Sequence, residues 1–272
     1  MDPAGSRRVD WDGHLILVHA NERQRRAGVA AWVQRGLELG AKILYIEPRQ
    51  ERADRSFLRV LREQDIATDE ALARGQLQVL PAGDEAYSPE RQTDVVDAAL
   101  AEGYPTVRWS GEASTGWDVL SKSGHADLEW AADALCRTRP VSMLCQYPAD
   151  LIPATLQSAC AMHGAGVRGA QCQIHPLPEG VAVAGEVDAA NARVLHSALM
   201  AATASADARA FVVELSRLSF LDAAGARALL KGTLTHRTQG GSVCLRALRP
   251  RVERFLRLFG VDRTDGFILE GA

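Results

Sequence analysis

Between residues 11 and 167, short hydrophobic runs alternate with longer segments of helical periodicity. The first run, 14–19, reads His-Leu-Ile-Leu-Val-His, and apolar residues recur at helical spacing in the segment that follows it, 22–39. The alternation continues through predicted strands at 42–46, 76–80, 106–109 and 141–145 and predicted helices at 54–64, 69–74, 89–102, 128–136 and 153–163. Alternating strands and helices favour right-handed crossovers and a mostly parallel sheet. We therefore predict an α/β domain for this part of the chain.

A glycine-rich segment, 164–169, interrupts this pattern, and we place a domain boundary there. The two predicted domains span residues 11–167 and 171–272. In the second, the pattern predicts strands at 171–174, 181–185, 210–215, 242–245 and 266–269 and helices at 191–203, 223–237 and 249–259. Asn191 and Asp222 stand where a side chain is expected to cap the start of a helix. The second domain is thus also predicted to be α/β.

Composition and charge narrow the classes of function. The 272 residues carry a net charge of −3 with basic residues scattered among acidic ones, so direct binding to nucleic acid is not expected. No apolar run approaches the roughly 20 residues that cross a bilayer, and the first residues contain no hydrophobic signal core. We expect a cytoplasmic protein that does not bind membranes. The five cysteines include no Cys-x-x-Cys pair, which predicts reduced, mostly buried thiols.

The most informative segment, 219–230, reads Ser-Phe-Leu-Asp-Ala-Ala-Gly-Ala-Arg-Ala-Leu-Leu and follows the apolar run 211–215. A buried strand is predicted to lead through a turn into a helix, with the Asp222 carboxylate accepting from backbone N–H groups of the first turn. Gly225 allows another surface to approach that turn closely. The turn is therefore a candidate recognition surface. The simpler interpretation is that Asp222 only caps the helix and that the alanines only favour helix formation.

Together with Gly185-Glu-Val-Asp188, this segment resembles the STAS domain of bacterial anti-sigma factor antagonists. The resemblance implies a mixed sheet with helices on one side and a partner-binding surface at the turn. In that family the second residue after the aspartate is usually a serine that a partner kinase phosphorylates, whereas this chain has Ala224 there and Ala223 before it. The resemblance therefore implies that this switch is absent. The residues that it assigns to partner binding are Asp188, Ser219, Asp222, Ala223, Ala224 and Gly225.

The first domain resembles the MEDS family of sensory modules. The matching motifs, in order, are Asp12-Gly-His14, Gly36-Leu-Glu-Leu-Gly-Ala41, Gly75-Gln-Leu77, Gly103-Tyr-Pro-Thr-Val-Arg108, Gly111-Glu112, Leu128-Glu129 and Leu144-Cys-Gln-Tyr147. The resemblance implies a relative of the RecA-type nucleotide-binding fold with three layers. The loop 19–26 lacks the glycines, lysine and hydroxyl of a Walker motif, so NTP hydrolysis is not expected. Its arginines leave anion binding open.

Four residues of the first domain are candidates for binding a ligand: His14, Glu112, Cys145 and His163. They could converge at the carboxyl edge of the sheet, where open α/β folds place ligands. Imidazole, thiolate and carboxylate groups would suit a zinc-like ion, and Cys145 could instead be a nucleophile with a histidine as its base. His14 and Cys145 could equally be satisfied residues at strand ends. We predict a small-molecule pocket, no metal or other cofactor, and no enzymatic activity.

These observations predict a cytoplasmic signalling protein in which a MEDS-like sensor controls a STAS module. By resemblance, the partner is an anti-sigma factor, often itself a kinase of the GHKL ATPase type, and its capture would release a sigma factor and alter transcription. One alternative is a scaffold that assembles with other STAS proteins into a stressosome-like particle. The other is an enzyme that depends on Cys145. Ser219 is not expected to be phosphorylated, because its apolar neighbours predict that it lies under the turn.

Overall fold

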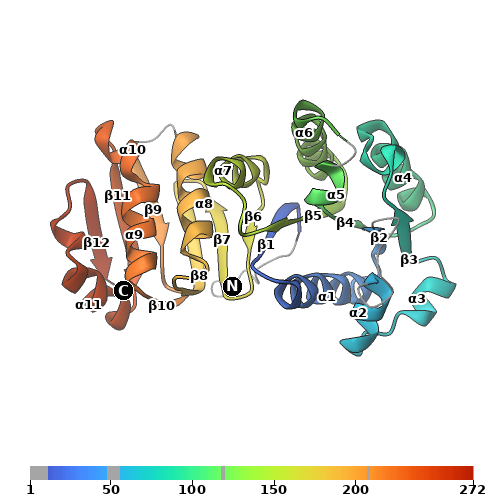
Figure 1. Cartoon of the computed structure of the whole chain (residues 1–272), viewed down its shortest axis with the longest axis horizontal. Coiled ribbons are helices and arrows are strands. Elements are labelled where there is room, and N and C mark those ends of the chain that lie inside the picture. Colours follow the sequence, from blue (N-terminus) through green and yellow to red (C-terminus); the bar gives the residue numbers. More distant parts are fainter. Residues whose placement is uncertain (1–11, 48–55, 118–119, 207–208, 272) are drawn as a thin grey trace, which may run out of the picture. The chain divides into compact units, whose positions relative to one another are not determined.

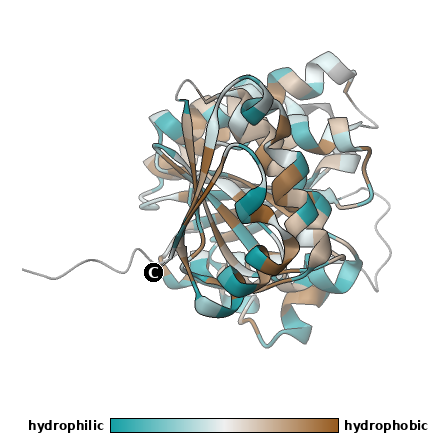
Figure 2. Ribbon diagram, turned by 90° about the vertical axis from the view of Figure 1, so that its left-hand side faces the viewer, coloured by the Kyte–Doolittle hydropathy of each residue, from teal (hydrophilic) through white to brown (hydrophobic). Residues whose placement is uncertain are grey.

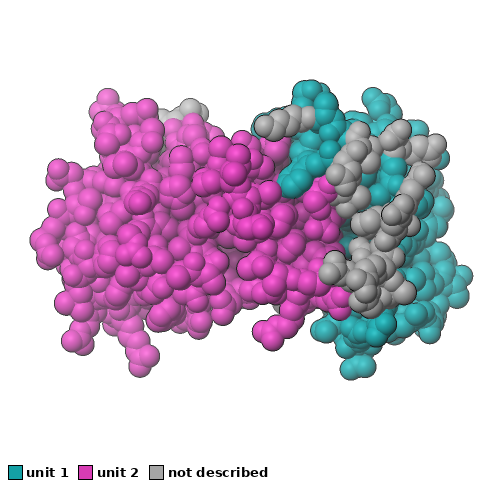
Figure 3. Space-filling model, viewed as in Figure 1, with its two compact units in different colours: residues 1–15, 30–111, 115–144 teal, residues 16–29, 112–114, 145–272 magenta. Residues whose placement is uncertain are grey.

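The computed structural model describes residues 12–47, 56–117, 120–206 and 209–271. The chain forms two compact units, which Figure 3 distinguishes by colour. Unit 1 consists of residues 1–15, 30–111 and 115–144, and unit 2 of residues 16–29, 112–114 and 145–272. Five elements have residues in both units: β1 (His14–His19), α1 (Glu22–Glu38), β4 (Val107–Glu112), α5 (Ala113–Trp117) and β5 (Val141–Pro148). The predicted α/β class is confirmed, with a large, mostly parallel sheet and a mixed C-terminal region.

Unit 1 is built around parallel strands and the helices that connect them (Figure 1). Its other elements are β2 (Lys42–Glu47), α2 (Phe57–Glu63), α3 (Asp69–Ala73), β3 (Leu77–Pro81), the 3-10 turn η1 (Asp84–Tyr87), α4 (Pro89–Ala101) and α6 (Lys122–Thr138). Strand β2 pairs in parallel with β3 on one side and with β4 on the other. Five of its six residues are buried, which explains its almost uninterrupted hydrophobic sequence.

The core of unit 1 packs helices α4 and α6 against the sheet. Leu128, Ala132 and Leu135 recur at helical spacing on α6 and share one buried cluster with Val96 of α4 and Trp109 of β4. Serine side chains cap both helices, because the hydroxyl of Ser88 accepts from the backbone N–H of Arg91 and that of Ser121 from the backbone N–H of Gly124. Helix α4 thus begins at Pro89 as predicted, whereas α6 begins at Lys122, six residues before its predicted start at residue 128.

Unit 2 contains the mixed region. Its remaining elements are α7 (Pro153–Met162), β6 (Gly166–Arg168), β7 (Cys172–Leu177), β8 (Gly180–Val187), α8 (Ala192–Ala204), β9 (Ala210–Glu214), β10 (Leu218–Leu221), α9 (Ala223–Gly232), α10 (Leu234–Thr238), β11 (Ser242–Leu248), α11 (Pro250–Phe259), the 3-10 turn η2 (Val261–Arg263) and β12 (Phe267–Gly271). The pairs β6–β7 and β7–β8 are antiparallel. The pairs β8–β9, β9–β11, β11–β12 and β8–β10 are parallel.

Helix α8 contacts α7 on one side and α9 on the other. Figure 2 shows hydrophobic residues, coloured brown, on the strands and on the helices that pack against them. At Gly232 of α9, an added Cβ atom would lie 2.9 Å from the Cβ atom of Leu199 on α8, so the missing side chain permits the close contact of the two helices. No helix in the described ranges is long and apolar enough to span a bilayer.

Three features of unit 2 differ from the pattern-based predictions. Strand β10 was not predicted, because its four residues are buried only at the two ends and so show no alternation that would signal a strand. The glycine-rich boundary segment contains the short strand β6. The predicted single helix 223–237 divides into α9 and α10 at Thr233, where the threonine hydroxyl donates to the carbonyl oxygen of Leu229 and Arg237 donates to that of Leu230. These side chains thus satisfy carbonyl groups at the division.

The backbone conformation at position 185, the first residue of the Gly185-Glu-Val-Asp188 motif, requires a glycine. Its φ of +93° lies in the region that favours glycine, and an added Cβ atom would overlap the backbone carbonyl oxygen of Gln171. We expect Gly185→Ala to lower the free energy of unfolding by more than about 2 kcal/mol, because the clash adds to a backbone cost of about 1–2 kcal/mol. Urea denaturation of the purified protein measures this change.

Gly240→Ala is the matched control. Gly240 has a similar φ of +87°, but no heavy atom lies within 4 Å of an added Cβ. Only the backbone cost of about 1–2 kcal/mol is expected there. Equal destabilisation by the two substitutions would show that the contact with Gln171 does not matter.

Candidate functional site

The turn between β10 and α9 is held by the carboxylate of Asp222. Its Oδ1 accepts from the backbone N–H of Gly225 at 2.9 Å, which confirms the predicted helix cap. Its Oδ2 accepts from the backbone N–H of Ala189 at 3.1 Å. One carboxylate thus caps α9 and also binds the turn that precedes α8. Nothing in the sequence pattern signalled this second bond, since the residues lie 33 positions apart.

Hydrogen bonds among its own residues hold the turn before α8 in place. The Asp188 carboxylate accepts from the backbone N–H of Ala190 at 2.8 Å, and the side chain of Asn191 accepts from the backbone N–H of Asp188 at 3.0 Å. Asn191 occupies the N-cap position of α8 as predicted, but its side chain makes no capping bond, because its oxygen binds this turn and its amide donates to the carbonyl of Glu186. Asp188 and Asp222 are therefore fixed by their own backbone contacts.

Ser219 and Phe220 lie at the edge of this turn. Ser219 was expected to lie under the turn, but it is exposed, and its hydroxyl donates to the carbonyl oxygen of Gly185 at 2.9 Å. Phe220 is 48% exposed, whereas Leu221 is buried. The prediction failed because only the two end residues of this short strand are buried, and its register against β8 shifts between Leu218 and Phe220. The surface thereby gains an exposed aromatic ring.

Small residues form the start of α9. Ala223 and Ala224 are half-buried, and neither offers a hydroxyl group. Gly225 is buried, and an added Cβ atom would lie 2.9 Å from Cγ1 of Val187 and overlap a methyl group of Leu221. The structure thus brings Asp188, Ser219, Asp222, Ala223, Ala224 and Gly225 to one region around two joined turns. We call this region the STAS turn surface.

In unit 1, His14 lies in a buried polar cluster with residues of α6. Its Nε2 is 3.1 Å from a carboxylate oxygen of Glu129, and its Nδ1 is 3.8 Å from one of Asp133. The other oxygen of Glu129 is 3.4 Å from Nε2 of His125, and burial lowers the pKa of His125. His125, Glu129 and Asp133 are spaced by four residues, so they share one face of the helix.

The location of this cluster corrects two expectations. His14 is the first residue of β1 and lies at its amino end, not at a carboxyl edge. The carboxylate beside it is Glu129, whereas Glu112 is half-buried at the end of β4. Glu129 belongs to the Leu128-Glu129 motif, and its i, i+4 spacing from His125 and Asp133 was the signal that could have identified it.

In unit 2, Cys145 and His163 form a second group of metal-ligating side chains. Each offers a ligand atom within 4.8 Å of the other. Cys145 is half-buried in β5, and His163 is buried directly after α7. Nδ1 of His163 lies 2.7 Å from the carbonyl oxygen of Ala159. A neutral imidazole that donates from Nδ1 presents Nε2 as an electron-pair donor, as a metal ligand requires.

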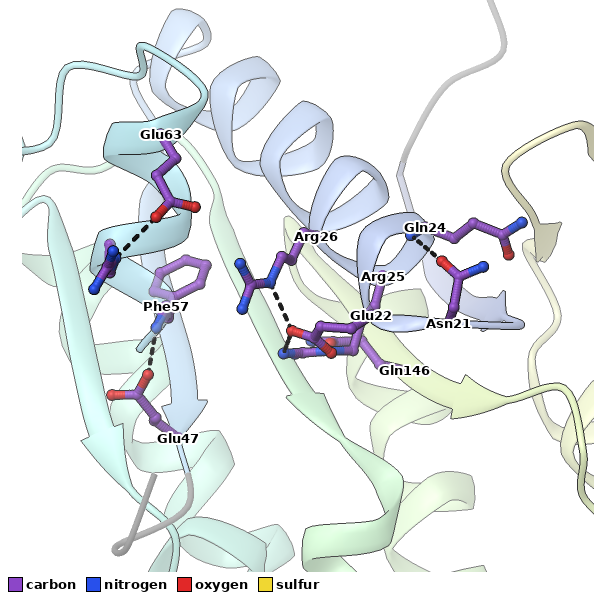
Figure 4. A network of polar contacts seen from close by, with 10 residues as sticks. Asn21, Glu22, Gln24, Arg25, Arg26, Glu47, Phe57, Glu63 and Gln146 are labelled. Atoms are coloured by element: carbon purple, nitrogen blue, oxygen red, sulfur yellow. Dashed lines mark hydrogen bonds and ion pairs between the residues drawn. The ribbon is translucent and has the colours of Figure 1, made fainter. Parts of the chain in front are cut away.

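The segment 19–26, expected to be a loop, lies partly in the first turns of α1, where two of its arginines bind a carboxylate of the same segment (Figure 4). Glu22 accepts from Nη2 of Arg25 at 2.6 Å and from Nε of Arg26 at 2.9 Å, and Arg25 also donates to Gln146. Asn21 accepts from the backbone N–H of Gln24 and thereby caps α1. The single carboxylate of Glu22 thus offsets one of the three arginine charges that left anion binding open.

This network predicts a pH dependence of stability. Partial burial alone would raise the pKa of Glu22, but hydrogen bonds from Arg25 and Arg26 lower it from 4.5 to about 2. Because the folded-state pKa is the lower one, the stabilisation is present above pH 4.5 and is lost as the pH falls toward about 2. We expect the stability difference between wild type and Glu22→Gln to shrink over this range in urea denaturation at several pH values.

Glu38→Gln provides a comparison on the same helix, since Glu38 lies 3.5 Å from Arg35 and both side chains are exposed. It should change the stability at pH 7 less than Glu22→Gln does. A Glu22→Gln effect that stays constant between pH 7 and pH 3 would contradict the assigned role of the ion pairs.

Two protein families match the chain, and their matches follow one another in the same order as the motifs described above. Residues 13–164, more than half of the chain, match the family described as the methanogen/methylotroph, DcmR sensory domain, MEDS. Residues 171–270 match the family described as Mlab, STAS domain. No curated protein matches the chain.

Two solved structures are similar to the chain at 10% sequence identity. The flagellar accessory protein FlaH from Methanocaldococcus jannaschii covers 62% of this chain and 75% of its own, with a TM-score of 0.43. A short-chain dehydrogenase from Oenococcus oeni PSU-1 covers 96% of this chain and 97% of its own, with a TM-score of 0.19. Neither similarity is strong enough to carry an argument, so the assignment follows from the family matches. The chain belongs to the MEDS family of sensory domains, and a STAS domain follows its MEDS domain.

Proposed function

We propose that the protein is a non-catalytic signalling regulator whose MEDS domain controls the binding of an anti-sigma factor by its STAS domain. The order of the two domains supports this proposal, since a sensory domain precedes a domain typical of protein-protein signalling. The partner is expected in the cytoplasm. Its capture would release a sigma factor, so the output would be a change in transcription without direct contact with DNA.

The observation that carries the proposal is the preformed turn surface, which has alanines and therefore no phosphoryl acceptor at positions 223 and 224. Asp222 holds both turns in place through bonds to Gly225 and Ala189. A phosphorylated side chain at position 224 would add nearly two negative charges in the same region as the carboxylates of Asp188 and Asp222. Ala224 cannot acquire that charge. The surface would therefore stay in the state that corresponds to the unphosphorylated, binding-competent form, and control would come from the MEDS domain.

The chemistry of the surface favours a partner that offers an apolar group to Phe220 and hydrogen-bond donors to the carboxylates. Phe220 exposes 48% of its surface, and exposed aromatic side chains often provide much of the binding energy of an interface. The carboxylates of Asp188 and Asp222 can meet basic groups of the partner. Ala223 and Ala224 let that partner approach the helix start closely. A kinase of the GHKL type, which resemblance suggests, would then bind without modifying position 224.

We expect Ala224→Glu to weaken binding at least tenfold, about 1.4 kcal/mol, because a carboxylate at a close contact clashes and repels. The measurement is calorimetric titration of the full-length protein with a purified anti-sigma factor encoded in the same genome. Ala204→Glu is the matched control, since Ala204 is exposed at the carboxyl end of α8, away from this turn. It should leave the affinity unchanged.

Equal affinity of Ala224→Glu and wild type would contradict the proposed surface. If affinity capture instead recovers only other STAS proteins and the sample sediments as one large homogeneous particle, a scaffold role replaces the antagonist role. Activity that Cys145→Ser abolishes without loss of fold would establish an enzyme.

A further inference from the structure

Helix α11 of unit 2 has a basic outer side, although the chain as a whole is negatively charged. The net charge of the chain is −3, yet its segment 246–263 contains six arginines and two carboxylates. Val252 and Leu256 are buried, whereas Arg251 and Arg254 are exposed. Because residues three positions apart are neighbours on a helix surface, these two arginines lie on the same side of α11. The outer side of this helix is therefore a concentrated positive patch.

Most of this positive charge is not offset by carboxylates of the same chain. Three arginines here have no side-chain hydrogen bond or ion pair with any residue that the structure describes: Arg251, Arg254 and Arg263. Arg257 differs, because it binds Glu253 at 2.8 Å and lies 4.0 Å from Asp262. A guanidinium group can bind a carboxylate of another molecule through two parallel hydrogen bonds. Three such groups are thus open to a partner.

The arginines border a shallow depression that also has an apolar part. Arg254, Leu258 and Arg263 are among the residues that line this depression, whose volume is about 370 Å³. Leu258 is 76% exposed. Phe255, three positions before it, is half-buried and stacks on Phe259. The depression therefore offers an apolar contact directly beside guanidinium groups.

This mixture favours a segment of a protein over a nucleic acid or an anionic membrane. Glu253 and Asp262 also line the depression, and their carboxylates would repel the closely spaced charges of a phosphate backbone or of anionic headgroups. A protein segment can instead place an apolar side chain against Leu258 and carboxylates against the arginines. Arginine and large apolar side chains are also enriched where proteins bind one another.

We propose that α11 binds an acidic, partly apolar segment of another protein, with Leu258 as the apolar contact and Arg251, Arg254 and Arg263 as partners of its carboxylates. All four residues belong to unit 2 and to the part of the chain that matches the STAS domain. The surface lies on a different helix from the STAS turn surface. The proposal does not depend on what that turn surface binds.

The test selects a library of short random peptides, displayed on phage, for binding to the full-length protein. We expect the enriched peptides to carry Glu or Asp on both sides of a large apolar residue. The most enriched peptide is then labelled with fluorescein and titrated with the protein, and fluorescence anisotropy gives its Kd. Arg254→Glu should raise this Kd roughly tenfold or more. Leu258→Ser should also raise it, and added NaCl should weaken binding to the wild type.

Arg91→Glu and Leu234→Ser are the matched controls. Arg91 is exposed in the first turn of α4, and Leu234 is 49% exposed on α10. Both variants should bind the peptide as tightly as wild type. Because all the substituted side chains are exposed, the thermal midpoints should stay close to that of wild type, and measuring them separates loss of a contact from loss of fold.

Three results would overturn the proposal. The first is a selection that enriches no acidic peptides. The second is equal affinity of wild type and Arg254→Glu for the enriched peptide. The third is cosedimentation of the wild type, but not of Arg254→Glu, with vesicles of phosphatidylcholine and phosphatidylglycerol, which would assign the patch to a membrane surface instead.

Discussion

The fold depends on the parallel pairing of strands that are buried on both faces. Such strands cannot be joined by tight hairpins, so each must be followed by a crossover, usually a helix, before the chain returns to the sheet. All six residues of β1 and five of the six in β2 are buried, and the intervening segment forms α1. This constraint fixes the alternation of elements and sets polar residues at strand ends, where they do not interrupt the hydrophobic layer.

Both functional regions use that arrangement, but they use it differently. On the STAS turn surface, one carboxylate joins two turns that follow two parallel strands, β8 and β10. Around His14, a strand residue meets one face of α6, where side chains four residues apart point the same way. In the first case backbone N–H groups are the partners of the acid. In the second they are side chains of the same helix face.

The replacement of a phosphorylatable residue by Ala224 changes the surface without changing its fold. Asp222 still caps α9, Gly225 still packs against Val187, and the exposed Phe220 remains beside them. The contacts that build the turn are therefore present although the position that the family resemblance assigns to a phosphorylated serine is an alanine.

The sequence by itself determined the class of fold, the order of most elements and the cap at Asp222, because these follow from hydrophobic period and from interactions a few residues apart. It also singled out His14, Cys145 and His163. Tertiary structure alone decided that Glu129 rather than Glu112 lies beside His14, that Asp222 binds Ala189, and that Ser219 and Phe220 are exposed. The physical reason is the separation, along the chain, of the residues that interact. Contacts between residues far apart in the chain depend on packing and strand register, and hydrophobic periodicity specifies neither.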